Sequence, residues 1–184
     1  MKIINFLRSR FRKWLNEEYW MEDYLKLGME VGVNCDINSG LMVDVSHCWL
    51  IEIKDNVTIA PKVYLLAQDA STKKLINFTK IGKVVLQNNC FVGARSIIMP
   101  SVIVGENAIV AAGSVVVKNV EKGTVVGGNP AKFIMFVEEL EEKHKLQIED
   151  ACVYGKEFLI QNGINDAMKK RMYNDLEGKN GYLI

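Results

Sequence analysis

The chain has 184 residues, a length that suits one principal domain with a well-filled hydrophobic core. With 23 basic and 22 acidic residues, its formal net charge of +1 gives no reason to expect nucleic acid as a partner. Four widely spaced cysteines form no CxxC pair and no zinc-like cluster, which predicts reduced structural thiols in a reducing compartment. We therefore expect a cytoplasmic protein with no metal site.

Residues 1–27 are predicted to form a helical cap over the start of the main domain. Their opening apolar run is too short, and too soon interrupted by arginines, to be a secretory signal or a membrane span. An aromatic cluster is expected to cover the first turn of the domain, and it consists of Tyr19, Trp20 and Tyr24. The alternative for the basic, amphipathic helix at the very start is a peripheral contact with an acidic membrane surface.

An aliphatic residue at every sixth position dominates the middle of the chain. The leading positions of the hexads are Val31, Ile37, Val43, Ile53, Ile59, Leu65, Leu86, Val92, Ile98, Val104, Val110 and Val116. Neither the 3.6-residue period of a helix nor the two-residue period of a simple strand gives this pattern. Three hexads can close one triangular coil, so the pattern predicts a prism of stacked short strands.

The repeat is interrupted twice and then gives way to a different composition. A short pause is predicted at Trp49–Glu52, and a polar excursion loop at residues 71–85 is a candidate functional loop. Beyond residue 136 the sequence predicts a helical extension over 137–184. A charged helix begins this extension, and a second helix begins at the capping residue Asn165.

The hexads, the loop and the segments AAGS and GGNPAK resemble the left-handed β-helix acyltransferases of the hexapeptide-repeat superfamily. The resemblance covers residues 28–136, and SHCWLIEIKDNVTIAPKVYLLAQDAST is most similar to bacterial sugar O-acetyltransferases of the maltose and galactoside type. It implies a β-dominated fold, a left-handed parallel β-helix with helical segments at both ends, and a homotrimer. It also implies acetyl-CoA as co-substrate and, as acceptor, a free, nucleotide-linked or lipid-linked sugar of surface polysaccharide biosynthesis.

The same resemblance assigns a coenzyme groove between adjacent prisms. Small residues there would let the pantetheine arm lie along the backbone, and lysines would attract the coenzyme's phosphates. The implied positions are Ala94, Ala112, Gly113, Val117, Lys118 and Lys132. Tight-turn packing is the alternative interpretation for Ala112 and Gly113, and a solvated surface charge is the alternative for the two lysines.

Gln68 departs from the family at the position of its catalytic histidine, because a stretch that would read AHDAS reads AQDAS in this chain. An imidazole can accept the proton of an attacking sugar hydroxyl, whereas a glutamine amide can only exchange hydrogen bonds. Loss of a positioned base typically costs about 10² to 10⁴ in rate. The substitution indicates a weakened or lost activity, an amine acceptor that needs less help from a base, or a deliberate replacement that traps a complex.

His47 is the histidine best placed to compensate. It precedes Gln68 by about one coil and the pause, so we expect it near the same corner one layer lower. A purely structural, hydrogen-bonded histidine is the alternative. Asp44 and Asp69 are further candidates for orienting the substrate or the imidazole, and His144 is interpreted as a surface residue of the charged helix.

The predicted function is therefore transfer of an acetyl group from acetyl-CoA to a hydroxyl or amino group of a sugar. The alternative is a non-catalytic or degenerate β-helix trimer that serves as a binding or assembly component. A zinc carbonic anhydrase built on the same prism needs three histidines across a subunit interface, and the chain has only two.

Overall fold

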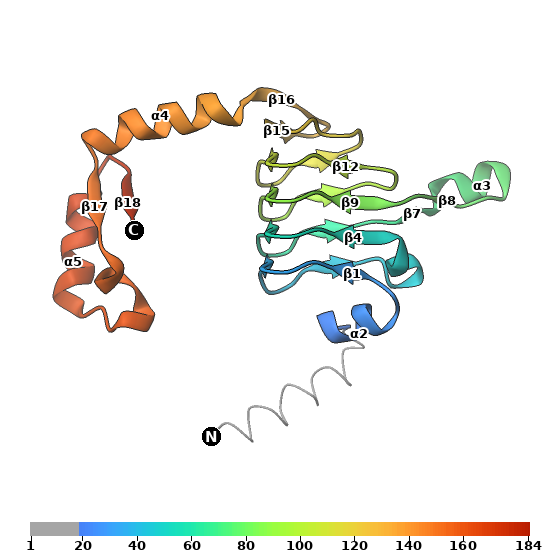
Figure 1. Cartoon of the computed structure of the whole chain (residues 1–184), viewed down its shortest axis with the longest axis horizontal. Coiled ribbons are helices and arrows are strands. Elements are labelled where there is room, and N and C mark those ends of the chain that lie inside the picture. The colour runs from blue at the N-terminus through green and yellow to red at the C-terminus, as the bar shows by residue number, and fades with distance from the viewer. Residues whose placement is uncertain (1–18) are drawn as a thin grey trace, which may run out of the picture. The chain divides into compact units, whose positions relative to one another are not determined.

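The computed structural model describes residues 19–184, which comprise most of one compact unit ending at Val137 and all of a second unit, Glu138–Ile184. A prism of stacked coils fills the first unit (Figure 1). In each coil the chain runs along three faces, here named A, B and C, and each face is a parallel sheet. This is the predicted left-handed parallel β-helix with helices toward the chain ends, so the fold-class prediction is confirmed.

The strands are two or three residues long except at the last coil. Face A contains β1 (Glu30–Val31), β4 (Ile51–Ile53), β9 (Val84–Leu86) and β12 (Ile103–Val104). Face B contains β2 (Asp36–Ile37), β5 (Thr58–Ile59), β10 (Phe91–Val92), β13 (Ile109–Val110), β15 (Thr124–Gly128) and the antiparallel β16 (Ala131–Phe136). Face C contains β3 (Met42–Val43), β6 (Tyr64–Leu65), β11 (Ile97–Ile98) and β14 (Val115–Val116).

The leading aliphatic residues of the hexads stack in columns inside the prism. On face C, Val43 pairs with Leu65, Leu65 with Ile98, and Ile98 with Val116. All four side chains are at most 5% exposed, so each coil buries the apolar residues of its neighbours. In the first coil Val31 is only partly buried, because no further coil lies below it. The short helix α2 (Met21–Lys26) lies at that end of the prism instead (Figure 1).

In nine of the twelve hexads, the fourth position turns the corner with a left-handed backbone. Its φ angles lie between 55° and 80° at Asn34, Gly40, Asn56, Lys62, Asn89, Arg95, Ser101, Asn107 and Gly113. Glycine adopts this conformation freely, and asparagine does so more easily than most other residues. The asparagines and glycines in the turns of the repeat are therefore explained by backbone geometry.

Both interruptions of the repeat differ from the prediction. The pause lies earlier than Trp49–Glu52, because the 3-10 turn η1 (Val45–Leu50) holds the extra residues and β4 has already begun at Ile51. The excursion is a hairpin over residues 68–83 and not a loop over 71–85. Its elements are β7 (Gln68–Asp69), η2 (Ala70–Thr72), α3 (Lys73–Ile76) and β8 (Lys80–Ile81).

The late end of the predicted loop was wrong because the hexad pattern marks only one residue of each strand, the lead residue of the hexad. Val84 and Val85 precede that residue, Leu86, in β9, where they pair with Ile51 and Glu52 of β4. Both valines are buried. Their apolar side chains therefore belong to the prism and not to the polar excursion.

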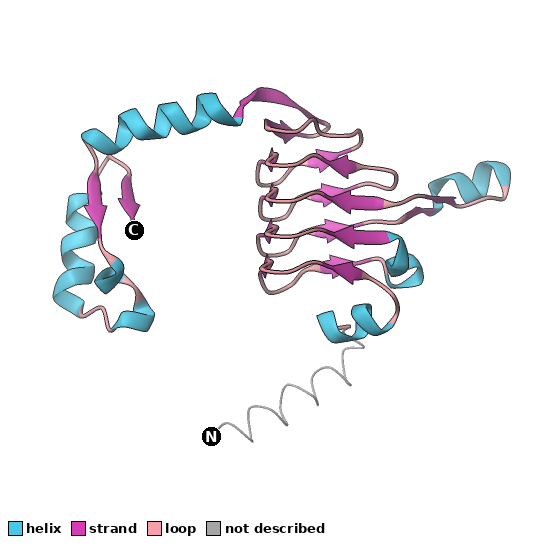
Figure 2. Cartoon of the chain, in the orientation of Figure 1, coloured by secondary structure: helices cyan, strands magenta, loops and turns pink. Residues whose placement is uncertain are grey.

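The second unit contains the two predicted helices and also two strands that were not predicted. Its elements are α4 (Val137–Glu149), β17 (Cys152–Tyr154), η3 (Lys156–Phe158), η4 (Ile160–Asn162), α5 (Asp166–Asp175) and β18 (Gly181–Leu183) (Figure 2). The side chain of Asn165 accepts a hydrogen bond from the Met168 amide at 2.9 Å, as a helix N-cap does. The parallel pair β17 and β18 is formed by short segments far apart in sequence, so no local period indicated it.

Part of the predicted N-terminal cap can be located. Within residues 1–27, α2 and its aromatic neighbours are described, whereas the basic, amphipathic helix considered for a membrane contact lies outside the described residues. From residue 19 onward, no helix combines the length and the apolar composition needed to cross a membrane.

Candidate functional site

The predicted site residues divide between two corners of the prism. The C–A corner, where the chain leaves face C for face A, carries Asp44, His47, Gln68, Asp69, Val117 and Lys118. The B–C corner, where the chain leaves face B for face C, carries Ala94, Ala112 and Gly113. Face C separates the two groups. Lys132 lies on β16, opposite Gly127 of β15.

Register places His47 and Gln68 at the same corner in successive coils. Met42 and Val43 of β3 pair with Tyr64 and Leu65 of β6, and the Asp44 amide then donates to the Leu65 carbonyl at 3.1 Å. From there one strand continues into η1 with His47, and the other continues into the hairpin with Gln68. Figure 2 shows this turn and the hairpin on the same side of the prism.

Asp44 and His47 face each other at the start of η1. One carboxylate oxygen of Asp44 accepts a hydrogen bond from the Ser46 amide at 3.1 Å, which caps the turn. Its other oxygen, Oδ2, lies 3.9 Å from Nδ1 of His47. Within residues 19–184, these are the two buried side-chain nitrogen or oxygen atoms that have no hydrogen-bond partner.

The two side chains of this pair differ in their access to solvent. The Asp44 side chain is 6% exposed, whereas that of His47 is 27% exposed. The Trp49 ring packs against the imidazole, with 5.4 Å between the ring centroids. The arrangement therefore leaves a buried carboxylate behind a histidine that a small molecule can reach.

Gln68 and Asp69 begin the hairpin as strand β7, where Gln68 pairs with Ile81 of β8. The Asp69 carboxylate accepts a hydrogen bond from the Ser71 amide at 2.9 Å. Hydrogen bonds from the side chain and backbone of Ser71 lower the pKa of Asp69. Asp69 thus caps the turn at the base of the hairpin. Asp44, the other candidate carboxylate, caps η1 instead.

The upper part of the B–C corner carries three small residues, Ala94, Ala112 and Gly113, next to the exposed side chain of Arg95. The Gly113 amide donates to the Ala94 carbonyl at 2.8 Å, which joins the corner of one coil to that of the next. Ala112 and Gly113 are exposed, and a Cβ atom at Gly113 would meet nothing within 4 Å. Below it, a Cβ at Gly93 would lie 2.4 Å from the Ala112 amide nitrogen. The corner is therefore tightly stacked within the prism and open on its outer side.

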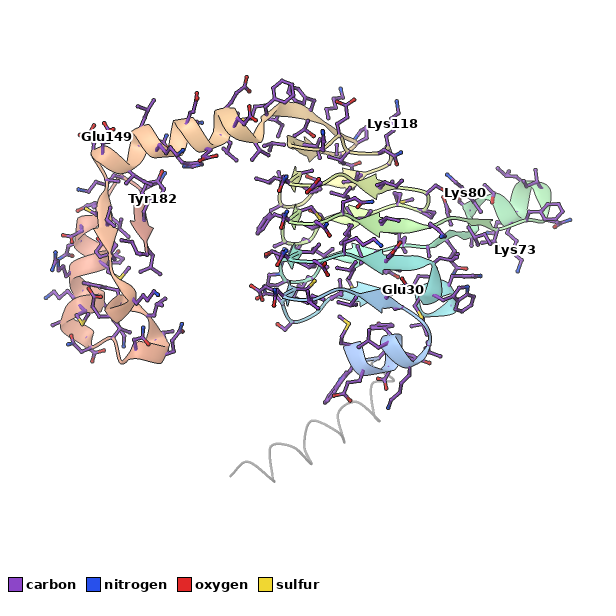
Figure 3. The ribbon with its side chains drawn as sticks, viewed as in Figure 1. Glu30, Lys73, Lys80, Lys118, Glu149 and Tyr182 are labelled. Atoms are coloured by element: carbon purple, nitrogen blue, oxygen red, sulfur yellow. The ribbon has the colours of Figure 1, made fainter. Side chains whose placement is uncertain are left out.

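The two candidate lysines lie on different elements. Lys118 follows β14 and lines a cavity of about 440 Å³ together with Phe133 and Phe136 of β16. In Figure 3 it lies on the side of the prism from which the hairpin with Lys73 and Lys80 projects. Lys132 is exposed on β16. In a single chain, the six positions implied for the coenzyme do not form one site.

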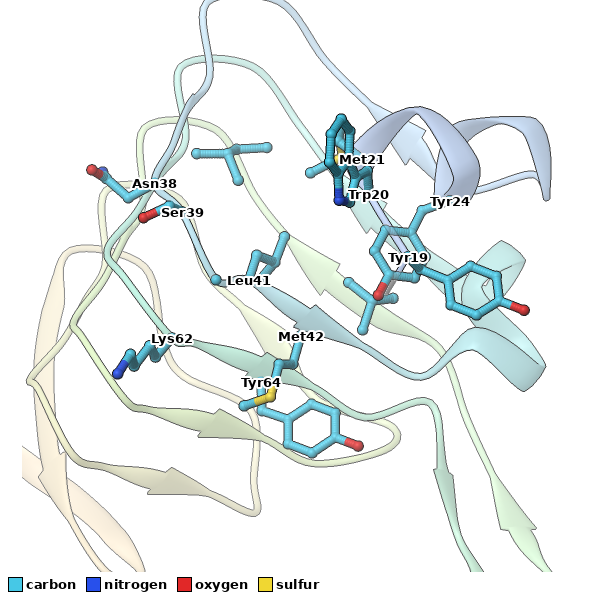
Figure 4. Close-up of a pocket in the computed structure, with 13 residues that line it drawn as sticks. Tyr19, Trp20, Met21, Tyr24, Asn38, Ser39, Leu41, Met42, Lys62 and Tyr64 are labelled. Atoms are coloured by element: carbon cyan, nitrogen blue, oxygen red, sulfur yellow. The ribbon is translucent and has the colours of Figure 1, made fainter. Parts of the chain in front are cut away.

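A larger cavity, of about 820 Å³, lies between α2 and the first coils (Figure 4). Tyr19, Trp20, Tyr24 and Tyr64 give it an aromatic lining, and Met42 lies beside Tyr64. From the sequence, Tyr19, Trp20 and Tyr24 were expected only to cover the first coil. Large outward side chains at the same position of successive coils, Met42 and Tyr64, were the signal that could have indicated a pocket.

Known proteins similar to this chain include several named acetyltransferases. The family model "Bacterial transferase hexapeptide (six repeats)" matches residues 83–118. "Putative acetyltransferase YvoF" of Bacillus subtilis is 31% identical over 141 residues, which cover 77% of this chain and 79% of that protein. Galactoside O-acetyltransferase of Escherichia coli is 24% identical over 157 residues, which cover 82% of this chain and 72% of that protein.

Two solved structures resemble the prism. A hexapeptide-repeat acetyltransferase from Vibrio cholerae, complexed with acetyl coenzyme A, superposes with a TM-score of 0.54 at 25% identity. That match covers 59% of this chain and 60% of the Vibrio chain. A maltose O-acetyltransferase from Clostridium difficile superposes with a TM-score of 0.50 at 25% identity, covering 62% of this chain and 73% of that one. With its repeat, its fold and these relatives, the chain belongs to the hexapeptide-repeat acetyltransferase family.

Proposed function

We propose that this protein transfers an acetyl group from acetyl-CoA to a hydroxyl or amino group of a sugar. The observation that carries the proposal is the group of small residues at the B–C corner, with open space beside Gly113, in a chain whose relatives include acetyltransferases. A long flexible ligand such as pantetheine can exchange hydrogen bonds with the backbone of small residues, because their side chains do not shield the peptide groups. The reaction would take place in the cytoplasm, where acetyl-CoA is available.

The residues present fit the coenzyme. Ala94, Ala112 and Gly113 would hold the pantetheine arm, and Val117 of a neighbouring copy would pack beside it. Lys118 and Lys132, both exposed, would supply positive charge to the phosphates. The bound coenzyme supplies an acetyl group activated as a thioester.

A homotrimer would bring the two corners together. The candidate residues for proton transfer lie at the C–A corner, and the group of small residues lies at the B–C corner of the same prism. A complete site therefore needs the B–C corner of one copy beside the C–A corner of the next, and such a head-to-tail contact closes into a ring under threefold symmetry.

The aromatic cavity supports a sugar as the acceptor. Its volume of about 820 Å³ lies in the range of small-molecule pockets, and its rings suit the apolar C–H faces of a sugar. Strand β3 runs from this cavity at Met42 directly to the C–A corner at Asp44. Lys62 at the edge of the cavity would favour an acceptor linked through phosphate to a nucleotide or a lipid, as in surface polysaccharide synthesis.

Filling the open corner tests the coenzyme assignment. Ala112→Leu is expected to raise the KM for acetyl-CoA about tenfold or more, because the side chain would occupy the space of the pantetheine arm. The matched control is Glu106→Leu, which adds the same side chain at the corresponding position of the preceding hexad, at a different corner. Release of coenzyme A thiol with glucose, maltose, galactose and glucosamine as acceptors measures both variants and the wild type.

The results also distinguish the second candidate function. Gln68 favours a degenerate scaffold, which would bind acetyl-CoA but release no thiol with any acceptor. Equal KM values for Ala112→Leu and Glu106→Leu would contradict the placement of the coenzyme at the B–C corner.

A further inference from the structure

The facing atoms of Asp44 and His47 are costly as a purely structural arrangement. A buried carboxylate oxygen or imidazole nitrogen without a hydrogen-bond partner destabilises a fold, so folded proteins usually satisfy such atoms. Here two of them lie 3.9 Å apart, and within residues 19–184 neither has another partner. A small movement of the partly exposed imidazole would join Nδ1 to Oδ2 in a hydrogen bond.

This pairing would determine which imidazole nitrogen can act as a base. A carboxylate accepts only, so it favours a proton on Nδ1 of His47. The lone pair then lies on Nε2, on the other side of the ring. The same division of roles, in which a carboxylate orients a histidine and stabilises it once protonated, operates in hydrolases with a catalytic triad.

Asp44 and His47 also lie where a base for acetyl transfer is expected. His47 occupies the C–A corner one coil below Gln68, and its side chain is 27% exposed. Strand β3, which ends one residue before Asp44, carries Met42, and Met42 lines the aromatic cavity. An acceptor in this cavity would therefore lie along the strand that leads to the pair.

We propose that His47, oriented by Asp44, removes the proton from the acceptor in place of the histidine that the family carries at Gln68. The inference rests on the proposed acetyl transfer. The acceptor oxygen or nitrogen forms a bond to the carbonyl carbon of the acetyl group, the bond from that carbon to sulfur breaks, and the electron pair leaves with sulfur. Nε2 of His47 takes the acceptor proton and returns it to the sulfur, which yields coenzyme A thiol and regenerates the neutral imidazole. Asp44 is a positioning residue and touches no substrate.

The ring tautomer tests this inference without any turnover. Long-range ¹H–¹⁵N NMR spectra of the full chain are expected to show His47 protonated on Nδ1 and unprotonated on Nε2. Asp44→Asn keeps an oxygen for the Ser46 amide but removes the carboxylate charge, so it is expected to shift the His47 tautomer equilibrium. His144, whose Nδ1 lies 2.9 Å from the Tyr182 hydroxyl, serves as the internal control and should not change.

Kinetics test the catalytic role. His47→Gln is expected to lower kcat by about 10² to 10⁴, with the KM for acetyl-CoA unchanged, because only proton transfer is lost. Asp44→Asn should lower kcat about tenfold or more, again without a change in that KM. His144→Gln is the matched control. The double variant His47→Gln/Gln68→His should recover much of the lost kcat, because it returns an imidazole to the family's position.

The outcomes separate this inference from the proposed function. Wild-type kcat in His47→Gln, or a His47 ring protonated on Nε2 in the wild type, would overturn the assignment of His47 and leave acetyl transfer intact. A wild type that releases no thiol with any acceptor would instead contradict the proposed function. Failure of the double variant to recover, together with weakened acetyl-CoA binding by His47→Gln, would show that His47 is structural.

Discussion

Asp44 and Asp69 make the same local contact and yet provide different chemistry. Each caps a 3-10 turn by accepting a hydrogen bond from the amide two residues later in the chain. In Asp44 the second oxygen is buried and faces His47. The sequence predicted both as candidates and did not rank them, because the direction of the second oxygen depends on how η1 folds. In contrast, the number of residues per coil was enough to predict that His47 lies at the same corner as Gln68, one coil below it.

The cap formed by Asp69 is expected to depend on pH. Because hydrogen bonds from Ser71 lower its folded pKa, ionised Asp69 stabilises the turn above its unfolded pKa, and this contribution is lost as the pH falls through the lowered folded value. Hydrogen exchange of the Ser71 amide, corrected for intrinsic rates, should therefore become faster at acid pH. The Met168 amide is the control, since uncharged Asn165 caps it. Equal pH dependence of the two amides would contradict this assignment.

At the scale of elements, the repeat in the sequence was enough to predict the coil, its three faces and its buried columns. Each hexad places an aliphatic side chain inward, and most hexads place a left-handed residue at the corner, so local pattern and tertiary packing agree. The bounds of the hairpin were not predicted, because the hexad pattern marks only one residue of each strand. The pair β17 and β18 was not predicted either, because it depends on pairing between segments distant in sequence, which no short period reports. The aromatic cavity was missed for the same reason, since its lining comes from α2 and two coils.

The corners offer a direct test of the repeat. Asn107 has φ of 55° at the fourth position of its hexad. Asn107→Val is expected to lower the free energy of unfolding by about 1–2 kcal/mol, because a β-branched side chain crowds the backbone in this conformation. Asn107→Gly is the control, since glycine adopts positive φ without this cost. Chemical denaturation measures both variants, and equal stability of the two would show that the corner does not require a left-handed residue.

For the molecule as a whole, the prism separates its candidate residues by one flat face. The C–A corner carries Asp44, His47, Gln68 and Lys118, and the B–C corner carries the group of small residues. In the proposed account, one chain therefore holds both halves of the site and cannot join them. Acetyl transfer, in this account, takes place where the C–A corner of one copy meets the B–C corner of its neighbour.

Mixed assemblies of two damaged copies test this claim most directly. Ala112→Leu damages only the B–C corner, and His47→Gln damages only the C–A corner, so each homotrimer would have every site impaired. Co-expression of the two with different tags should restore acetyl transfer, because about a quarter of the shared sites would then combine two intact corners. The assay is thiol release at an acetyl-CoA concentration below the KM of Ala112→Leu. Activity well above that of either parent is the predicted result, and a mixture no more active than its components would contradict the account.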